Sequence, residues 1–244
     1  AVGRTHRRSD ADERTRQFLD PAVVDVVERG RSPAEHRTVG AAFVVIDGIR
    51  QQHDVGSDLV ADRLNGLSAS VAAACREHDV CWLESDSEHG RIRLLLTVGA
   101  PVRRENDAER LVDAVRTIAD PHEDRVGVAQ GREIVGEVGH QARRPYNFLG
   151  SNVNLAARLT AAADPGMVLR TAAVARLVSR RFEPEPVPAL RLKGFADPVG
   201  TAALRGSRAV PIERRTTHTL HGRDAEVRSV LERIDGLCEA GSSV

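Results

Sequence analysis

The sequence has few lysines, few aromatic residues, three cysteines and no net charge. A formal charge of zero at pH 7 indicates no electrostatic attraction to a polyanion, so a nucleic acid is not expected as a partner. The cysteines Cys75, Cys81 and Cys238 have neither zinc-ligand spacing nor the pattern of a disulfide framework, which suits a reducing cytosol. Because no apolar run approaches the ~18 residues of a membrane span and no signal peptide is visible, we expect a soluble cytoplasmic protein without a membrane partner.

Lysine is nearly absent, since Lys193 stands alone against 34 arginines. The arginines are dispersed and balanced by 35 carboxylates, so this bias is typical of a GC-rich genome and does not indicate a nucleic-acid surface. The chain does contain enough apolar residues for a packed core, because 41% of its 244 residues are hydrophobic. Its length allows one large or two small domains.

Hydrophobic periodicity and turn residues predict helices interspersed with antiparallel strand pairs. The expected helices span residues 18–29, 57–77, 106–119 and 171–179, and a further one follows Gly150. The expected strands span residues 39–46, 80–83, 92–98, 125–129, 133–138, 167–169, 187–193 and 199–204, with a polar turn at 84–90 and a glycine turn at Gly131. This arrangement differs from regular βαβ units and favours an α+β fold, an α/β sandwich with a ferredoxin-like core.

Composition suggests three segments: residues 1–35 as a polar linker with a short helix, 36–206 as the domain, and 207–244 as a linker followed by a new helix. The stretch His221-Gly222-Arg223-Asp224-Ala225-Glu226 resembles the opening of AAA-type signalling ATPase domains, although no phosphate-binding loop follows it. Two interpretations stay open here: the truncated start of an ATPase domain in a fragment of a larger protein, and an ordinary C-terminal helix.

Residues 145–158 carry the most functional information. A short apolar strand turns at Gly150 and leads into a helix that carries Asn154 and Arg158. Four residues apart on a helix, these two side chains lie on one face, with Cβ atoms about 6 Å apart. An amide donor and a fixed guanidinium fork both suit the oxygens of a phosphate chain. Ordinary helix surfaces also carry Asn and Arg at this spacing.

From Tyr146 to Arg158 the sequence resembles the signature of class III nucleotidyl cyclases, which convert ATP or GTP to the 3′,5′-cyclic nucleotide and pyrophosphate. The family pattern is Tyr, a base-reading residue, two apolar residues, Gly, two variable residues and then Val-Asn-x-Ala-x-Arg, and every fixed position is filled. Further matches in the family's order extend the resemblance over about residues 36–205, among them Gly127–Gly131, Gly136–Gly139 and Leu192–Phe195. The resemblance is nearest to the second, degenerate cyclase unit of tandem soluble-type proteins, in which an ATPase region follows.

The resemblance implies an active site formed between two cyclase domains, with metal ligands from one domain and the Asn/Arg pair from the other. Asn154 is then expected to orient the ribose, Arg158 to neutralise charge on the phosphate and Asn147 to contact the purine. ATP is the expected substrate, with GTP left open because an amide can both donate and accept hydrogen bonds. Mg²⁺ or Mn²⁺ is expected as cofactor, held mainly by the partner domain.

Two departures from the family pattern concern the metal ions. The family's Phe-x-Asp-Ile-x-Gly here runs from Phe43 to Gly48, so that Val45 replaces the metal-binding Asp, and an isopropyl group cannot ligate Mg²⁺. Asp47 points to the same strand face, but about 6 to 7 Å farther along the strand.

The second metal carboxylate of the family lies in a Gly-Asp at the hairpin turn, where this chain has the acidic stretch 84–90. Asp86 or Glu88 could approach that place, although an acidic turn is more often solvated surface, and His89 is read as a plain loop residue. The family's base-reading Lys is also missing, because residues 78–93 contain no lysine.

Three hypotheses follow. The first is one half of a cyclase heterodimer or tandem, which supplies Asn154 and Arg158 and takes its metal ions from a second cyclase domain. Two copies of this chain would then form two sites, neither of which binds metal. The second is a regulatory pseudo-cyclase that binds a nucleotide or a partner cyclase domain without chemistry. The third is a scaffold whose motif arose by chance, which the ordered series of matches disfavours.

Overall fold

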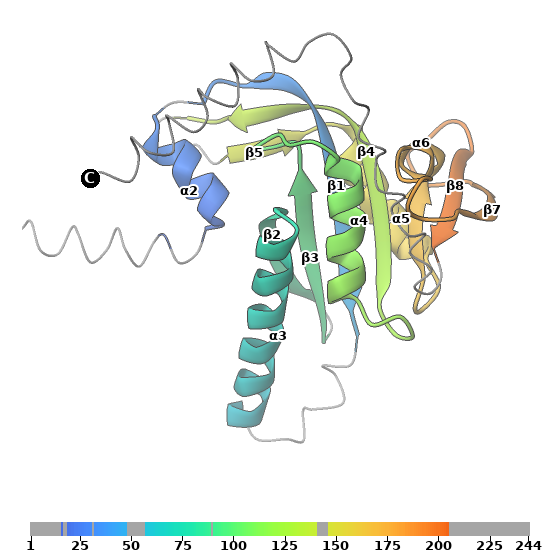
Figure 1. Ribbon diagram of the computed structural model, residues 1–244, viewed down its shortest axis with the longest axis horizontal. Coiled ribbons are helices and arrows are strands. Elements are labelled where there is room, and N and C mark those ends of the chain that lie inside the picture. Colours follow the sequence, from blue (N-terminus) through green and yellow to red (C-terminus); the bar gives the residue numbers. More distant parts are fainter. Residues whose placement is uncertain are drawn as a thin grey trace, which may run out of the picture. The chain divides into compact units, whose positions relative to one another are not determined.

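The computed structural model describes residue 16 and residues 19–30, 32–47, 57–88, 90–140 and 146–204 (Figure 1). The expected linker and helix over 207–244 lie outside these residues, and the three predicted segment boundaries stay predictions. Within the described part of the chain, no helix is long and apolar enough to cross a membrane.

The strands of the described residues form one sheet in the order β2-β3-β1-β4-β6-β8-β7, with β5 paired to β4. All neighbouring strands are antiparallel except β4 and β6, which are parallel. The strands are β1 (Glu35–Ile46), β2 (Cys81–Glu88), β3 (Arg91–Val98), β4 (Arg125–Glu137), β5 (Tyr146–Leu149), β6 (Val168–Thr171), β7 (Glu185–Leu190) and β8 (Val199–Leu204).

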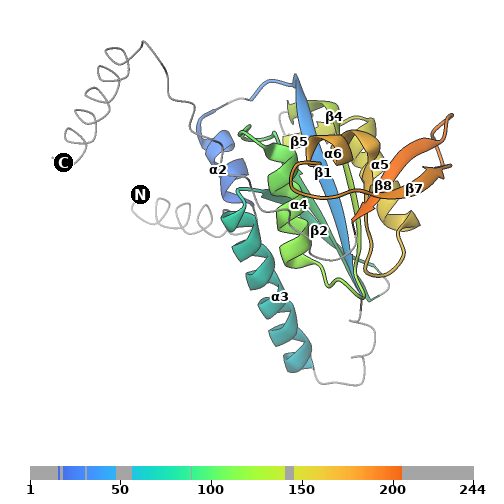
Figure 2. The same ribbon diagram turned by 45° about the vertical axis from the view of Figure 1, so that its right-hand side comes forward.

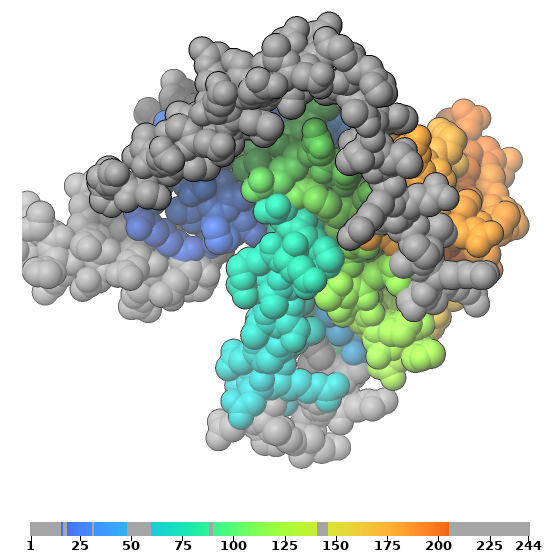
Figure 3. All heavy atoms as spheres, in the orientation of Figure 1, coloured from blue at the N-terminus to red at the C-terminus, as the bar shows by residue number. Residues whose placement is uncertain are grey.

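Helices cover both faces of this sheet, and the described ones are α2 (Pro21–Glu28), α3 (Ser57–Glu77), α4 (Asp107–Ile118), α5 (Ser151–Ala162) and α6 (Ala172–Leu177). Side chains of β1 alternate between two cores, because successive strand residues point to opposite faces. Ala42 and Val44 pack in the core that α3, α4 and α6 cover, whereas Ala41 packs in the core beneath α5. Helices α3 and α4 lie side by side in two views, and in the space-filling view they lie in front of the strands (Figures 1, 2 and 3). The predicted α+β sandwich is confirmed.

The predicted pair of strands around Gly131 is wrong, because β4 runs without a turn from Arg125 to Glu137. Gly131 lies inside this strand, opposite Val39 of β1. A Cβ atom at Gly131 would lie 2.0 Å from the side-chain nitrogen of Asn152. This glycine therefore makes room for α5 and does not turn the chain.

The prediction of a polar turn at residues 84–90 is also wrong, because most of this stretch forms a strand. Strand β2 continues through this stretch to Glu88, and Gly90 lies in the turn that precedes β3. Because β2 is the edge strand of the sheet, polar side chains can stay in contact with water along it. One of them, Asp86, accepts a hydrogen bond from Nη2 of Arg93 on the neighbouring strand at 2.8 Å.

Arg170 on β6 is fully buried and poorly paired. Its Nη2 donates to the carbonyl oxygen of Glu183 at 3.4 Å, while Nε and Nη1 have no hydrogen-bond partner among the described residues. Burial lowers the pKa of Arg170 from its ordinary value to about 10. Because the lowered pKa lies far above 7, the guanidinium is still charged at neutral pH and the full cost of burying it is present there.

We expect Arg170→Met to raise the free energy of unfolding by about 1 to 4 kcal/mol, because an apolar side chain of similar length removes a buried, uncompensated charge. Urea unfolding of the variant and the wild type at neutral pH measures this difference. A variant that unfolds at lower urea concentration than the wild type would contradict the expectation.

Candidate functional site

Helix α5 is held close to β4 by the absence of side chains at two glycines of that strand. A Cβ at Gly127 would lie 2.2 Å from the carbonyl oxygen of Ala156 and 2.4 Å from the backbone nitrogen of Thr160. Gly131 makes similar room for Asn152 at the first turn of the helix. The Thr160 hydroxyl adds a link to β1, because it lies 3.3 Å from the carbonyl oxygen of Phe43.

The first turn of α5 is fixed by a buried carboxylate. Glu133 of β4 is 1% exposed, and its Oε1 accepts a hydrogen bond from the backbone nitrogen of Asn152 at 2.7 Å. A carboxylate at this end of a helix also interacts favourably with the helix dipole. A Cβ at Gly150 would lie 1.5 Å from Oε2 of Glu133. The backbone at Gly150 is extended, with φ 165°, a conformation that any residue can adopt. The site therefore needs glycine at position 150 for space, not for an unusual backbone angle.

Asn154 and Arg158 both lie exposed on α5, while Leu155 and Leu159 hold the opposite side of the helix in the core. The Asn154 side-chain nitrogen donates to the carbonyl oxygen of Gly150 at 3.3 Å. Within the described residues, Arg158 has no ion pair. The structure thus brings Asn154 and Arg158 together on one exposed helix surface.

Asn147 lies on β5, the short strand that leads into α5, and pairs with Gly136 of β4. Its side chain is half-buried. Its two neighbours in the sequence, Tyr146 and Phe148, contact each other edge to face, with ring centroids 5.6 Å apart. Strand β5 and its pairing with β4 therefore set the position of Asn147 relative to the start of the helix.

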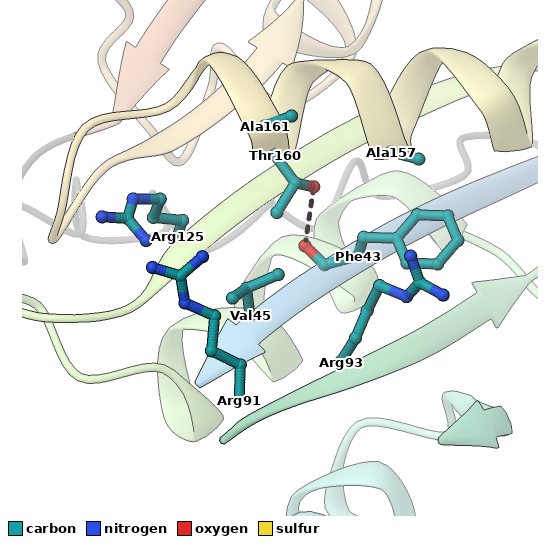
Figure 4. Close-up of a pocket in the computed structure, with 8 residues that line it drawn as sticks. All are labelled: Phe43, Val45, Arg91, Arg93, Arg125, Ala157, Thr160 and Ala161. Carbon is teal, nitrogen blue, oxygen red and sulfur yellow. Dashed lines mark hydrogen bonds between the residues drawn. The ribbon is translucent and has the colours of Figure 1, made fainter. Parts of the chain in front are cut away.

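A pocket of about 510 Å³ lies on the sheet face that α5 covers (Figure 4). Asn154 and Arg158 do not line it. The helix side consists of Ala157, Thr160 and Ala161, and the sheet side consists of Phe43, Val45, Arg91, Arg93 and Arg125. We call this the arginine pocket.

The register of the strands explains why the three arginines lie near Val45. Val45 on β1 pairs with Arg93 on β3 and with Arg125 on β4, so the valine lies between two arginines in one cross-strand row. Two residues after Val45, directly beyond the end of β1, Asp47 accepts hydrogen bonds from Nε of Arg91 at 2.5 Å and from Nη1 of Arg125 at 2.6 Å. Figure 4 shows the guanidinium groups of Arg91 and Arg125 directed toward each other beside Val45.

Comparison with known proteins identifies the family. Residues 32–221 match the family described as the adenylate and guanylate cyclase catalytic domain. The chain belongs to this family. Among curated proteins, this cyclase domain is similar to the uncharacterized protein Rv1318c of Mycobacterium tuberculosis, with 32% identity over 160 residues. That alignment covers 59% of this chain, which spans only 28% of the relative.

Solved cyclases share the fold. The adenylyl cyclase CyaB from P. aeruginosa superposes with a TM-score of 0.62 at 20% identity, covering 73% of this chain and 100% of that one. The guanylate cyclase domain of RhGC from Catenaria anguillulae, solved in complex with GTP, gives a TM-score of 0.60 at 18% identity. That second superposition covers 72% of this chain and 100% of the other.

Class III cyclases use divalent metal ions, but the donor set of the arginine pocket does not fit one. Val45 offers no ligand atom, and Asp47 is held between Arg91 and Arg125. Asp86 pairs with Arg93, while the side chains of Glu88 and His89 lie outside the described residues. Across the described residues, no three His, Cys, Asp or Glu side chains gather closely enough to hold a metal ion. We therefore assign no metal-dependent step to this pocket.

Sequence reasoning missed the arginines. The family pattern has Gly-Asp at the hairpin turn, and in this structure Gly90 lies in the turn and Arg91 begins β3. That dipeptide, at the end of a long acidic stretch, is the local signal for Arg91. No local pattern distinguishes Arg93 or Arg125 from the other dispersed arginines.

Asp124 is a buried carboxylate that binds the backbone of Asp47, the partner of Arg91 and Arg125. It is 5% exposed, and its two oxygens accept hydrogen bonds from the backbone nitrogens of Asp120 at 2.8 Å and Asp47 at 3.3 Å. Burial raises the pKa of Asp124 above 3.8, while the two backbone hydrogen bonds oppose that rise. The folded protein therefore binds a proton at Asp124 more readily than the unfolded chain does.

The sign of the pH effect follows from this raised pKa. Ionised Asp124 destabilises the fold at neutral pH, and protonation removes that cost as the pH falls through the raised pKa toward 3.8. We expect the difference in unfolding free energy between wild type and Asp124→Asn to move in favour of the wild type over this range. Urea unfolding at several pH values measures it, and a difference that is independent of pH would contradict the assignment.

Proposed function

We propose that this cyclase domain supplies the Asn154 and Arg158 half of an active site shared with a second cyclase domain, which brings the metal ions. The proposal rests on one observation: both side chains are exposed together on α5 and lie outside the arginine pocket. A partner domain can therefore reach them without entering the pocket. The chain's own pocket, lined by Val45 and three arginines, does not supply metal-binding carboxylates.

The reaction proposed for the shared site is the conversion of ATP to cyclic AMP and pyrophosphate. The ribose 3′-oxygen loses its proton and forms a bond to the α-phosphorus, and the bond from that phosphorus to the bridging oxygen of pyrophosphate breaks. Divalent metal ions, held by carboxylates of the partner domain, would supply activation of the hydroxyl and charge stabilisation of the leaving group. Asn154 orients the ribose through its amide, and Arg158 donates to phosphate oxygens that gain charge in the transition state. Asn147 contacts the purine.

The side chain proposed to contact the base is an amide, which suits both purines. Asn147 can donate to and accept from either adenine or guanine. We propose ATP as the substrate and test GTP as the competing substrate in the same assay.

The direct test is a cyclase assay with Mn²⁺ on the chain alone and on the chain mixed with a cyclase domain that has its metal-binding carboxylates but lacks its own Asn and Arg. Cyclic nucleotide formed only in the mixture supports the shared site. Robust product from the chain alone would show that it binds its own metal ions and would overturn the proposal.

A second candidate function is a regulatory pseudo-cyclase, which binds a nucleotide or a partner cyclase domain and performs no chemistry. The observation that favours it is the arginine pocket, where the only described carboxylates in reach, Asp47 and Asp86, are already paired with arginines. It predicts that the mixture binds nucleotide but forms no cyclic product, which separates it from the shared-site proposal.

A further inference from the structure

Among the described residues, the arginine pocket has more cationic side chains than carboxylates paired with them. Three guanidinium groups line it, and two carboxylates, Asp47 and Asp86, pair with them. Each guanidinium carries five N–H donors, and the carboxylates occupy only some of these. The remaining donors face a pocket whose other walls are the small or apolar side chains of Val45, Phe43, Ala157 and Ala161.

The cationic groups form two centres on opposite sides of Val45. On one side, Arg91 and Arg125 converge on Asp47. On the other side, the guanidinium of Arg93 lies over the ring of Phe43, 5.7 Å from its centroid (Figure 4). Arg93 and Arg125 are two strands apart, so their backbones are separated by about 10 Å. A ligand that contacts both centres therefore needs an extended row of acceptors.

Among biological anions, a chain of two or three phosphates has this form. Guanidinium groups bind phosphate oxygens through paired, charge-assisted hydrogen bonds, which suits such a chain better than a compact single anion. A volume of about 510 Å³ lies within the range of small-molecule pockets. A divalent cation, by contrast, would meet three positive charges, and the described residues that line the pocket include no carboxylate.

We infer that the arginine pocket binds the phosphate chain of a di- or triphosphate directly through Arg91, Arg93 and Arg125, without a divalent cation. The guanidinium groups occupy the place where the family pattern expects metal-binding carboxylates. This site is separate from the surface of Asn154 and Arg158, so it does not depend on the shared-site function. Either one can fail while the other holds.

Replacing Asp47 has opposite effects on ligand affinity in an anion site and in a metal site. In an anion site, its carboxylate competes with the ligand for Arg91 and Arg125. Asp47→Asn removes that competitor and leaves a side chain of the same shape, so it strengthens anion binding. In a metal site, the same change would remove a ligand and weaken binding.

The experiment is isothermal titration calorimetry of the 244-residue chain with pyrophosphate, ATP or orthophosphate, in EDTA and then with Mg²⁺. We expect saturable binding of pyrophosphate in EDTA, with orthophosphate weaker. The double variant Arg91→Ala/Arg125→Ala should lose about tenfold or more in affinity, and Asp47→Asn should gain several-fold. Arg76→Ala, an exposed arginine on α3 at the other face of the sheet, is the matched control and should bind like the wild type.

Circular dichroism of each variant checks that the fold is retained, and Asp47→Asn keeps the test decisive if the double alanine variant does not fold. Equal binding of pyrophosphate and ATP assigns recognition to the phosphate chain, and tighter ATP binding adds a nucleoside contact; both support the inference. No pyrophosphate binding in EDTA, binding only with Mg²⁺, or weaker binding by Asp47→Asn would overturn it.

Discussion

Arg158→Ala is expected to reduce cyclic nucleotide formation by about a hundredfold or more when this domain is mixed with a metal-competent cyclase domain. The guanidinium acts on charge that grows on the phosphate during the reaction, so its loss affects turnover far more than nucleotide binding. Folding should change little, because Arg158 is exposed and makes no ion pair within the described residues. Steady-state assays of the mixture measure the effect, as a drop in kcat at saturating nucleotide.

Two further variants test whether the loss of turnover is specific to the guanidinium of Arg158. Arg158→Lys retains the charge but loses the planar fork, so we expect activity between that of the wild type and that of the alanine variant. Arg176→Ala removes another exposed arginine, in the last turn of α6, and should leave turnover unchanged. Undiminished turnover of Arg158→Ala would remove this residue from the reaction and with it the proposed division of the site.

Gly127→Ala is expected to lower the free energy of unfolding by about 3 kcal/mol. The added methyl would lie 2.2 Å from the carbonyl oxygen of Ala156 and 2.4 Å from the nitrogen of Thr160. Both atoms belong to the backbone of α5, so no side-chain rotation can relieve the clash and the helix must move away from β4. Urea unfolding gives the stability loss.

Gly66→Ala provides the matched control for that variant. Gly66 lies in the exposed part of α3, and nothing lies within 4 Å of a Cβ placed there. Alanine is the better helix former, so this substitution should stabilise the protein by up to about 1 kcal/mol. If Gly127→Ala were as stable as the wild type, the close contact between α5 and β4 would be wrong.

The position of α5 matters for function because its surface carries Asn154 and Arg158. Gly127 and Gly131 set the distance of the helix from the sheet, and Glu133 fixes its first turn. A shift of the helix by a fraction of a turn would displace both proposed catalytic side chains together. Loss of turnover in Gly127→Ala would therefore exceed what its remaining folded fraction explains.

Local patterns in the sequence predicted the elements that depend on near neighbours. Helix α3 has the expected bounds Ser57–Glu77, because its apolar residues keep the helical period. The strand, the glycine and the helix that carries Asn154 and Arg158 also lie where the signature predicted them. Gly131 was misread, since a glycine that turns the chain and one that admits a neighbouring helix look the same in a single sequence.

By itself the sequence determined the fold class, the family resemblance and the adjacency of Asn154 and Arg158, because these follow from hydrophobic periodicity, short motifs in order and helical spacing. Only the tertiary structure decided that Arg93, Val45 and Arg125 form one row and that Asp47 joins Arg91 to Arg125. Those contacts depend on the register of three strands that are distant in the chain, and register is set by the packing of both sheet faces as a whole.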